Sequence, residues 1–545
     1  MNLLNMFKKK PLAVVALDER GSVDAATAAH PADGPQDRSH AEILVVVGAL
    51  MLAMLLSALD QTIVSTALPT IAVDLNGLSK LSWVATAYLL SSAIVTPIYG
   101  KLGDLFGRKK IFQIAIIIFL IGSALCGLSQ NIDQLVFFRA LQGIGGGGLM
   151  ALILAIIGDI VPPRQRGRYQ GYFGAVFAVS SVAGPLLGGL FTEHLSWRWI
   201  FYINIPLGLI ALSAVGAKLH LPAVRLKRKI DYLGAALLAI AITTILLVSV
   251  WGGTQYAWGS GTIMSLIATA VIFTGAFIVR EKHAAEPIIP LGLFRSDIFV
   301  VSVLLSLLSG IAMFASILYI PQYQQIVRGN TPTESGLLML PLVLGLLLAS
   351  TLSGRYVSKS GHYRKMPIIG TALLTFGIWL FSHLTLTTSH FVLSIWMLII
   401  GAGLGMFMQV ATLAVQNSTK REMLGTATST VIFFRSIGSS LGGAVFGTIL
   451  TARLTHHIQQ VLPNVSGVAN GVLHTGVSKL PDNLKHQVLG AYVNSFHDMF
   501  LLAIPFTVAA FIVSLFLRET PLRNSTREMA QAEGFEGEHH NKQTS

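Results

Sequence analysis

Asp60 and Arg139 are opposite charges placed inside long apolar segments of the sequence. Asp60 stands 11 positions before Ile71, the end of its segment, which is a rise of about 16 Å in a helix. A charge in apolar surroundings is costly unless it faces a partner or a water-filled cavity. We therefore expect the two side chains to interact directly or through water, and a proton on Asp60 to loosen the pair. The alternative is a static buried ion pair.

Arg435 is another cation inside an apolar segment, and its half of the chain offers no obvious acidic partner. Three interpretations are open: the side chain is solvated beside an aqueous cavity, binds an anionic group, or extends to the membrane surface. Other polar and aromatic residues are candidates to line a substrate cavity with it, although such residues often only pack. These candidates are Gln61, Tyr88, Gln142, Gln409 and Phe434.

A glycine-rich loop with one acid and four bases runs from Gly100 to Lys110. Gly100 and Gly107 permit a tight turn, and Asp104 can pair with Arg108 or accept hydrogen bonds from a helix N-terminus. A charge cluster of this kind can stabilise one conformation and release another, as a gate does. The alternative is a simple basic anchor at a membrane surface.

Several kinds of site have no signal in the sequence. The one cysteine, Cys126, allows no disulfide within the chain, and no Cys/His cluster suggests a metal. The run Gly145–Gly148 lacks the Gly-Lys-Ser/Thr ending of a nucleotide-binding loop. No nucleophile–base pair indicates an enzyme. We therefore expect no catalytic residues, no metal, no cofactor and no bound nucleotide.

Membrane-spanning helices are the elements that must position these residues. Of the 545 residues, 53% are hydrophobic and 12% are charged, whereas soluble proteins are about 25% charged. A spanning helix needs about 20 mostly apolar residues. The sequence therefore predicts an all-α integral membrane protein with fourteen spans: 43–71, 81–100, 111–129, 134–160, 168–191, 199–217, 231–251, 262–280, 298–320, 335–354, 366–384, 391–415, 425–451 and 498–517.

Basic residues alternate from one side of the predicted spans to the other. With the N-terminus in the cytoplasm, the inner segments hold 30 of the 38 Lys and Arg residues and the outer segments hold 6. Inner loops of membrane proteins carry such an excess, so we expect both termini in the cytoplasm. The same distribution accounts for the net charge of +13 without nucleic-acid binding.

The two halves of the sequence share a pattern. The loop after the tenth span repeats the glycine and basic spacing of the Gly100 loop, with Ser358 in place of Asp104. Two parallel six-helix repeats, with two extra spans between them, are therefore expected. The predicted parts are a cytoplasmic tail (1–41), an N-terminal bundle (42–218), a linker with two spans (219–285), a C-terminal bundle (286–518) and a second cytoplasmic tail (519–545). The C-terminal bundle is expected to carry a long outer loop, 452–497, whose residues 482–497 lie along the outer surface.

Taken together, these motifs resemble those of the major facilitator superfamily, and in particular its fourteen-spanner drug:proton antiporter family, over roughly residues 43–518. Besides the Gly100 loop, the similar stretches are Leu59–Val64 with Ala67–Ile71, Arg139–Gly143, Gly184–Gly189, Trp197–Phe201 and Asn204–Pro206. The resemblance implies the major facilitator fold of two six-helix bundles. It also marks Gly184, Pro185, Gly188 and Gly189 as an antiporter motif found in exporters; a kink that only packs is the alternative.

The resemblance implies a proton-coupled transporter that exports small hydrophobic or cationic drugs across the inner or plasma membrane. Its partners would be those substrates, protons and the lipid bilayer, and the proton gradient would supply the energy through Asp60 and Arg139. An exporter of a lipid, a siderophore or another metabolite on the same scaffold is the alternative. A non-transporting membrane scaffold or receptor is an alternative of another class, which the absence of proton-linked flux would support.

Overall fold

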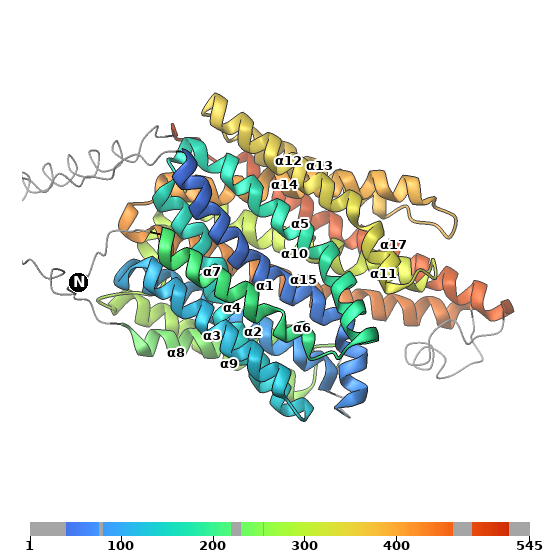
Figure 1. Cartoon of the computed structure of the whole chain (residues 1–545). Helices are drawn as coiled ribbons and strands as arrows, with labels where there is room; N and C mark the ends of the chain where they lie inside the picture. The colour runs from blue at the N-terminus through green and yellow to red at the C-terminus, as the bar shows by residue number, and fades with distance from the viewer. Residues whose placement is uncertain (1–39, 76–79, 220–229, 254, 462–481, 523–545) are drawn as a thin grey trace, which may run out of the picture.

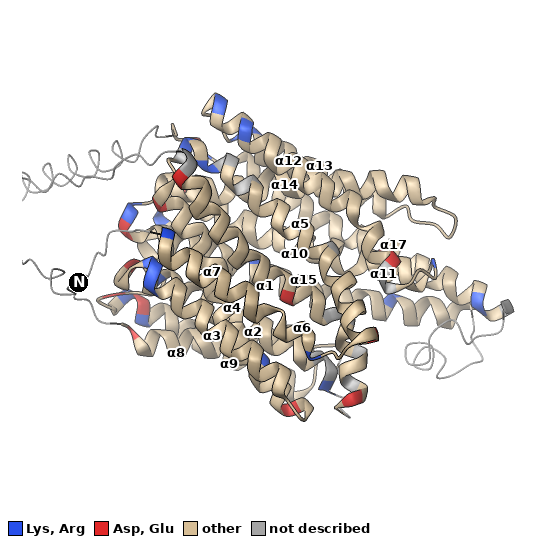
Figure 2. Ribbon diagram, viewed as in Figure 1, with Lys and Arg blue, Asp and Glu red and all other residues tan. Residues whose placement is uncertain are grey.

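The computed structural model describes residues 40–75, 80–219, 230–253, 255–461 and 482–522. Within these ranges the regular structure is helical, apart from one isolated bridge between Gly252 and Tyr256. The long helices lie side by side with their axes roughly aligned (Figure 1). Charged residues gather towards the two ends of these helices, and most of the ribbon between them is uncharged (Figure 2). This arrangement suits lipid, because each helix satisfies its own backbone N–H and C=O groups.

The first half of the chain forms a bundle around α4. Its glycine run allows close packing on two sides: a Cβ on Gly145 would overlap α3 at Phe119, and one on Gly147 would overlap α2 at Ser92. The sixth predicted span is broken at Ile203 into two helices. The helices of this half are α1 (His40–Asp74), α2 (Leu81–Phe106), α3 (Arg108–Leu128), α4 (Ile132–Ile160), α5 (Pro163–His194), α6 (Trp199–Tyr202) and α7 (Asn204–Lys218).

Two helices, α8 (Tyr232–Trp251) and α9 (Gly261–His283), follow as a hairpin that packs through α8 against α2 and against α15 of the second half. Asp231 begins the hairpin, since its carboxylate accepts the Gly234 N–H and pairs with Arg280 at 3.0 Å. Burial raises the pKa of Asp231, but the hydrogen bonds from Arg280 and Gly234 outweigh it, so the pKa lies below its usual range.

The second half repeats the packing of the first. Its central helix is α14, in which a Cβ on Gly401 or Gly405 would overlap α12, and one on Gly403 would crowd α13 at Leu374. The elements of this half are η2 (Leu291–Arg295), α10 (Asp297–Ile326), α11 (Pro332–Leu338), α12 (Leu340–Ser360), α13 (Lys365–Phe381), α14 (His390–Ser418), η3 (Arg421–Met423), α15 (Leu424–Val461) and α17 (Asp482–Leu515).

Each of the fourteen predicted spans contains a helix. Thirteen helices in the described part of the chain are long and apolar enough to cross a membrane, and α13 is an apolar helix of 17 residues. The predicted all-α membrane architecture is therefore confirmed, with α13 as the short member. The predicted tails lie mostly outside the described residues, and the division into parts stays a prediction.

The expected outer loop, 452–497, differs most from the structure. Helix α15 continues to Val461, and α17 begins at Asp482 and runs without a break into the last span. Residues 452–461 and 482–497 are therefore helical rather than loop, and the placement of 482–497 along the outer surface stays a prediction. Leu454 and Ile458 of α15 pack in one core cluster with Val488 and Tyr492 of α17. This packing stabilises both helices beyond the point at which the hydropathy of the sequence falls.

Candidate functional site

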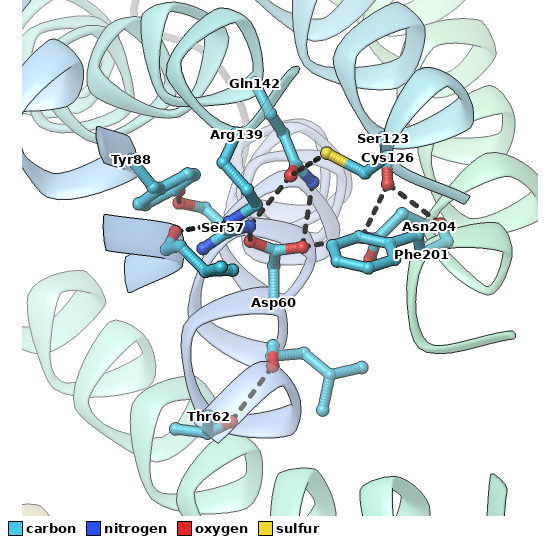
Figure 3. Close-up of polar contacts among 12 residues, drawn as sticks. Ser57, Asp60, Thr62, Tyr88, Ser123, Cys126, Arg139, Gln142, Phe201 and Asn204 are labelled. Atoms are coloured by element: carbon cyan, nitrogen blue, oxygen red, sulfur yellow. Dashed lines mark hydrogen bonds and ion pairs between the residues drawn. The ribbon is translucent and has the colours of Figure 1, made fainter. Parts of the chain in front are cut away.

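The centre of the first bundle holds a buried polar cluster around Asp60 of α1 (Figure 3). Arg139 Nη1 on α4 lies 2.6 Å from Asp60 Oδ2. Gln142 Nε2, one turn further along α4, donates to Oδ1 at 2.8 Å, and Asn204 Nδ2 on α7 donates to the same oxygen at 3.0 Å. The side chains of Asp60 and Arg139 are 0% and 2% exposed, so the pairing expected from the sequence is present and fully buried.

The Arg139 guanidinium is held on several sides. It donates to the backbone carbonyl of Val84 at 3.2 Å and to Gln142 Oε1 at 2.8 Å. Its carbon lies 4.4 Å from the centre of the Tyr88 ring, a cation–π contact. The Tyr88 hydroxyl is 3.1 Å from Ser57 Oγ, so α1 and α2 both fix the ring. An arginine with this many partners keeps one orientation as long as Asp60 is ionised.

A second layer of side chains supports the donors to Asp60 (Figure 3). Asn204 Nδ2 also donates to Ser123 Oγ at 3.0 Å, and Ser123 donates to the Phe201 carbonyl at 2.8 Å. Cys126 Sγ lies 3.6 Å from Gln142 Oε1. These contacts connect α3, α4 and α7, so the hydrogen bonds of the Asp60 carboxylate are linked to side chains on several helices of the bundle.

The electrostatic consequence concerns the proton. Removing the charge of one member of a buried, hydrogen-bonded ion pair leaves the other unpaired and costs several kcal/mol. A proton on Asp60 would leave Arg139 as an uncompensated cation in the bundle interior. A change in the charge of Asp60 would therefore disturb the contacts that join α1, α4 and α7.

The antiporter-like segment of α5 lies directly against α1 beside this cluster. A Cβ on Gly184 would overlap the side chain of Thr62, two residues after Asp60, and Thr62 donates to the Ser180 carbonyl at 2.9 Å. Pro185 lies on the other side, where α11 approaches at Gly336. Gly188 accepts a hydrogen bond from Thr192 of its own helix. Gly189 has open space around it, so four residues that share one motif have unequal packing roles.

The segment Gly100–Lys110, expected to be a loop, is the end of α2, a turn at Gly107 and the start of α3, and it connects the two halves at one end of the bundle. We call this end, which carries segments 101–110 and 355–365, the basic end. Asp104 pairs with Arg108 at 2.8 Å and accepts the backbone N–H groups of Gly425 (3.0 Å) and Thr426 (2.7 Å) in the first turn of α15. Both interactions expected of Asp104 are thus present, and the α15 N-terminus is where a carboxylate is favoured.

Two glycines and a second acid complete the loop. Gly107 has φ 90°, a conformation that favours glycine, and a Cβ on Gly100 would overlap Ser429 of α15. Arg108 also pairs with Asp159 at 2.7 Å, which ties the loop to the end of α4. In the second half, Ser358 and Lys359 accept hydrogen bonds from Arg164 of α5 through their backbone carbonyls, at 3.0 and 3.1 Å.

The remaining predicted cavity residues fall into two groups. Tyr88 and Gln142 belong to the Asp60 cluster. Gln61 is exposed next to Asp60, whereas Gln409, Phe434 and Arg435 are partly buried in the second half. Among the described residues, the side chains of Gln409, Phe434 and Arg435 form no hydrogen bond or ion pair with the cluster. Phe434 packs instead in an apolar group with Phe294, its ring 6.4 Å away, and with residues of α8.

Sequence reasoning missed the roles of Ser57, Ser123, Cys126 and Asn204 in the cluster. Asn204 had a usable signal, because an amide inside an apolar segment needs a hydrogen-bond partner. Serine and cysteine occur throughout the apolar segments, so nothing in the pattern distinguishes Ser123 or Cys126 from residues that only pack.

Comparison with known proteins supplies the family context. A model of the Major Facilitator Superfamily matches residues 50–443. The chain is 41% identical over 483 residues to an uncharacterized MFS-type transporter of Mycobacterium tuberculosis, covering 88% of this chain and 70% of that one. It is 36% identical over 516 residues to the multidrug transporter protein MdtP of Bacillus subtilis, covering 89% and 95%. The solved structure of the proton:xylose symporter XylE matches with a TM-score of 0.57 at 16% identity, covering 90% and 99%.

Proposed function

The chain belongs to the major facilitator superfamily, and because it is therefore a membrane transporter rather than an enzyme, we propose that it exports small hydrophobic or cationic compounds in exchange for protons. The observation that carries the proposal is the Asp60 carboxylate, which is 0% exposed and bound by Arg139 at 2.6 Å. A carboxylate at this position is costly to keep unless its charge is used. Proton coupling is the use that its chemistry supports.

The proposed mechanism alternates the partner of Asp60. In one state the ionised carboxylate binds Arg139, Gln142 and Asn204, as the structure describes. When the packing opens to the proton-rich side, a proton takes the place of Arg139 and the pair separates. A cationic cargo competes for the same carboxylate from the other side, so cargo and proton occupy the site in turn. That competition is the requirement for antiport.

Conformational change in this scheme depends on the basic end. Asp104 at the α15 N-terminus and Arg164 at the end of α12 hold the halves together there. Release of these contacts would let the two bundles rock about the site, as alternating access requires. The gate role of Gly100, Asp104, Gly107 and Arg108 is part of the proposal.

Drugs are the proposed cargo class, and the plasma or inner membrane is the proposed location. A relative that is 36% identical over 89% of this chain is named a multidrug transporter, which supports the class. The excess of Lys and Arg in alternate loops supports cytoplasmic termini. The proton gradient supplies the energy, and the scheme needs no cofactor.

The test is proton movement triggered by compounds in proteoliposomes, with wild type compared with Asp60→Asn over a panel of lipophilic cations and neutral drugs. Asp133→Asn is the matched control, because Asp133 is an exposed carboxylate of the same bundle, 68% exposed and paired with Lys80. We expect some compounds to release protons in wild type and in Asp133→Asn, and none to do so in Asp60→Asn.

The opposite results are equally informative. Proton release that persists in Asp60→Asn removes Asp60 from the coupling mechanism. Compound flux in wild type without any proton movement contradicts antiport while leaving transport intact. No flux of any drug directs the search to lipids, siderophores and other metabolites.

A further inference from the structure

Arg435 lies on an inward face of α15, eleven residues after the helix begins at Leu424. Residues three and seven positions further on, Gly438 and Gly442, share its face, since three and seven residues correspond to about one and two turns. Both glycines are buried against α10, where a Cβ would overlap Leu307 or crowd Ile311. The Arg435 carbonyl itself touches α10 at Gly310. The residue therefore points away from the lipid side of the bundle.

The Arg435 guanidinium has no hydrogen bond, ion pair or ring contact with any residue that the structure describes. The other arginines at comparable positions differ: Arg139 binds Asp60, and Arg108 binds both Asp104 and Asp159. An arginine left unpaired inside a membrane bundle is costly and is kept where it contacts water or a ligand. Its positive charge is unmatched within the described part of the bundle.

Partial exposure places this charge within reach of a ligand. Arg435 keeps an intermediate share of its surface although its helix face is turned to α10. The adjacent Phe434 packs the other way, with Phe294 and α8, and leaves Arg435 uncovered by that ring. Arg139 already compensates Asp60, whereas no acid among the described residues compensates Arg435. Such a charge attracts an acidic group on the cargo, and a cationic group elsewhere on the same compound remains free to reach Asp60.

We propose that Arg435 binds a carboxylate group on the cargo, so that the preferred compounds are amphiphiles with a free acid, including zwitterions that also carry an amine. This inference rests on the proposed export function and narrows its substrate class. The planar guanidinium can donate two parallel hydrogen bonds to a carboxylate, which an ester cannot accept with the same charge assistance. Arg435 is then the specificity residue of the second half, separate from the proton-coupling pair of the first.

The test compares two dyes that differ in one group: rhodamine B, which has a free carboxylate, and its ethyl ester, in which the acid is blocked. Two quantities are measured on purified wild type, Arg435→Gln and Arg435→Lys. The first is dye binding by fluorescence anisotropy in detergent, and the second is proton-driven dye flux in proteoliposomes. Arg453→Gln is the matched control, because Arg453 is on the same helix but pairs with Asp498 near its outer end.

We expect wild type and Arg453→Gln to favour the acid over the ester, and Arg435→Gln to lower the acid-to-ester ratio by about tenfold or more, since a charge-assisted bidentate contact is lost. Arg435→Lys should fall between them, because it keeps the charge without the planar fork. An equal ratio in wild type and Arg435→Gln, in binding and in flux, overturns the proposal. A site that takes only an inorganic anion gives that result too.

The readouts separate this inference from the proposed function. If Arg435→Gln loses the preference for the acid in binding, and wild type shows proton-driven flux of both dyes, the Arg435 site and the export function are both supported. Acid preference in binding without any proton-driven flux supports the Arg435 site and contradicts the export function. Proton-driven flux in wild type without any preference for the acid supports the export function and contradicts the Arg435 site.

Discussion

Asp60 illustrates how a single side chain can join several helices. Its two oxygens accept hydrogen bonds from side chains of α4 and α7, and the donors are themselves tied to α3 through Ser123 and Cys126. In a low-dielectric interior such a network is stable only while its members stay satisfied. Protonation of one carboxylate is therefore sufficient to unbalance contacts in four helices at once.

Asn204 offers a direct test of this network at the residue scale. Asn204→Ala removes one donor to Asp60 and should lower stability by about 1–2 kcal/mol. Asn204→Asp should lower it further, because a second carboxylate would face Asp60 Oδ1 where an N–H now lies 3.0 Å away. Thermal unfolding of the purified protein in one detergent at neutral pH measures the order wild type, Ala, Asp.

The two substitutions control each other, because both remove the same amide donor and only one adds a charge. Equal stability of Asn204→Asp and wild type would mean that the pair of carboxyl groups at positions 60 and 204 does not carry two negative charges. That outcome would contradict the expectation that the site requires an uncharged donor at position 204.

The pairing of Asp60 with Arg139 could be predicted from the sequence, and Tyr88 and Gln142 could be named as candidates, but the contact of Asn204 with Asp60 could not. Two opposite charges at overlapping depths in apolar segments have few ways to be satisfied, so their contact follows from energy alone. Asn204 is 144 positions from Asp60, and its approach depends on how α7 packs against α1, which hydropathy does not encode. Likewise, Arg164 binds backbone carbonyls of α12, and a carbonyl has no sequence signature.

At the element scale, the contact of α1 with α5 governs the environment of the site. Gly184→Leu would force α5 away from Thr62 and so disturb α1 two residues from Asp60. We expect it to abolish most proton-coupled export, whereas Gly189→Ala in the same motif should keep export within about twofold, because a Cβ there meets open space. Dye export and protein abundance in membrane vesicles are the measurements, normalised to each other.

Retained export in Gly184→Leu at normal abundance would show that α1 tolerates displacement. A loss in Gly189→Ala equal to that in Gly184→Leu would assign the motif a role other than helix packing.

Helix lengths show where hydropathy reaches its limit as a predictor. Each predicted span contains a helix because lipid demands about 20 apolar residues. Helix α15 nevertheless extends ten residues beyond its predicted end at 451. Those extra turns are polar on one side and bury Leu454 and Ile458 against α17 on the other. A membrane pattern ends where the helix leaves the lipid, whereas the helix ends where its packing ends.

At the scale of the whole molecule, the two halves meet at the basic end through contacts of opposite polarity. Asp104 places a carboxylate at the N-terminus of α15, and Arg164 places a guanidinium at the C-terminus of α12. Each matches the partial charge of the helix end that it touches. The structure is therefore a state closed at this end, and export in the proposed direction requires both contacts to open during each cycle.

Arg164→Ala should shift the molecule towards the state open at the basic end. The lost hydrogen bonds reach backbone carbonyls at a partly exposed site, so the shift is about 1 kcal/mol, or about fivefold in the ratio of states. Spin labels at Lys110→Cys and Ser418→Cys, both exposed at this end in opposite halves, report the distance; the native Cys126 is buried.

Ser358→Ala is the control, because Ser358 contributes only its backbone carbonyl to Arg164. A longer distance in Arg164→Ala and an unchanged one in Ser358→Ala would establish that Arg164 holds α12 through its backbone carbonyls. Equal shifts in both would assign it to the serine side chain instead.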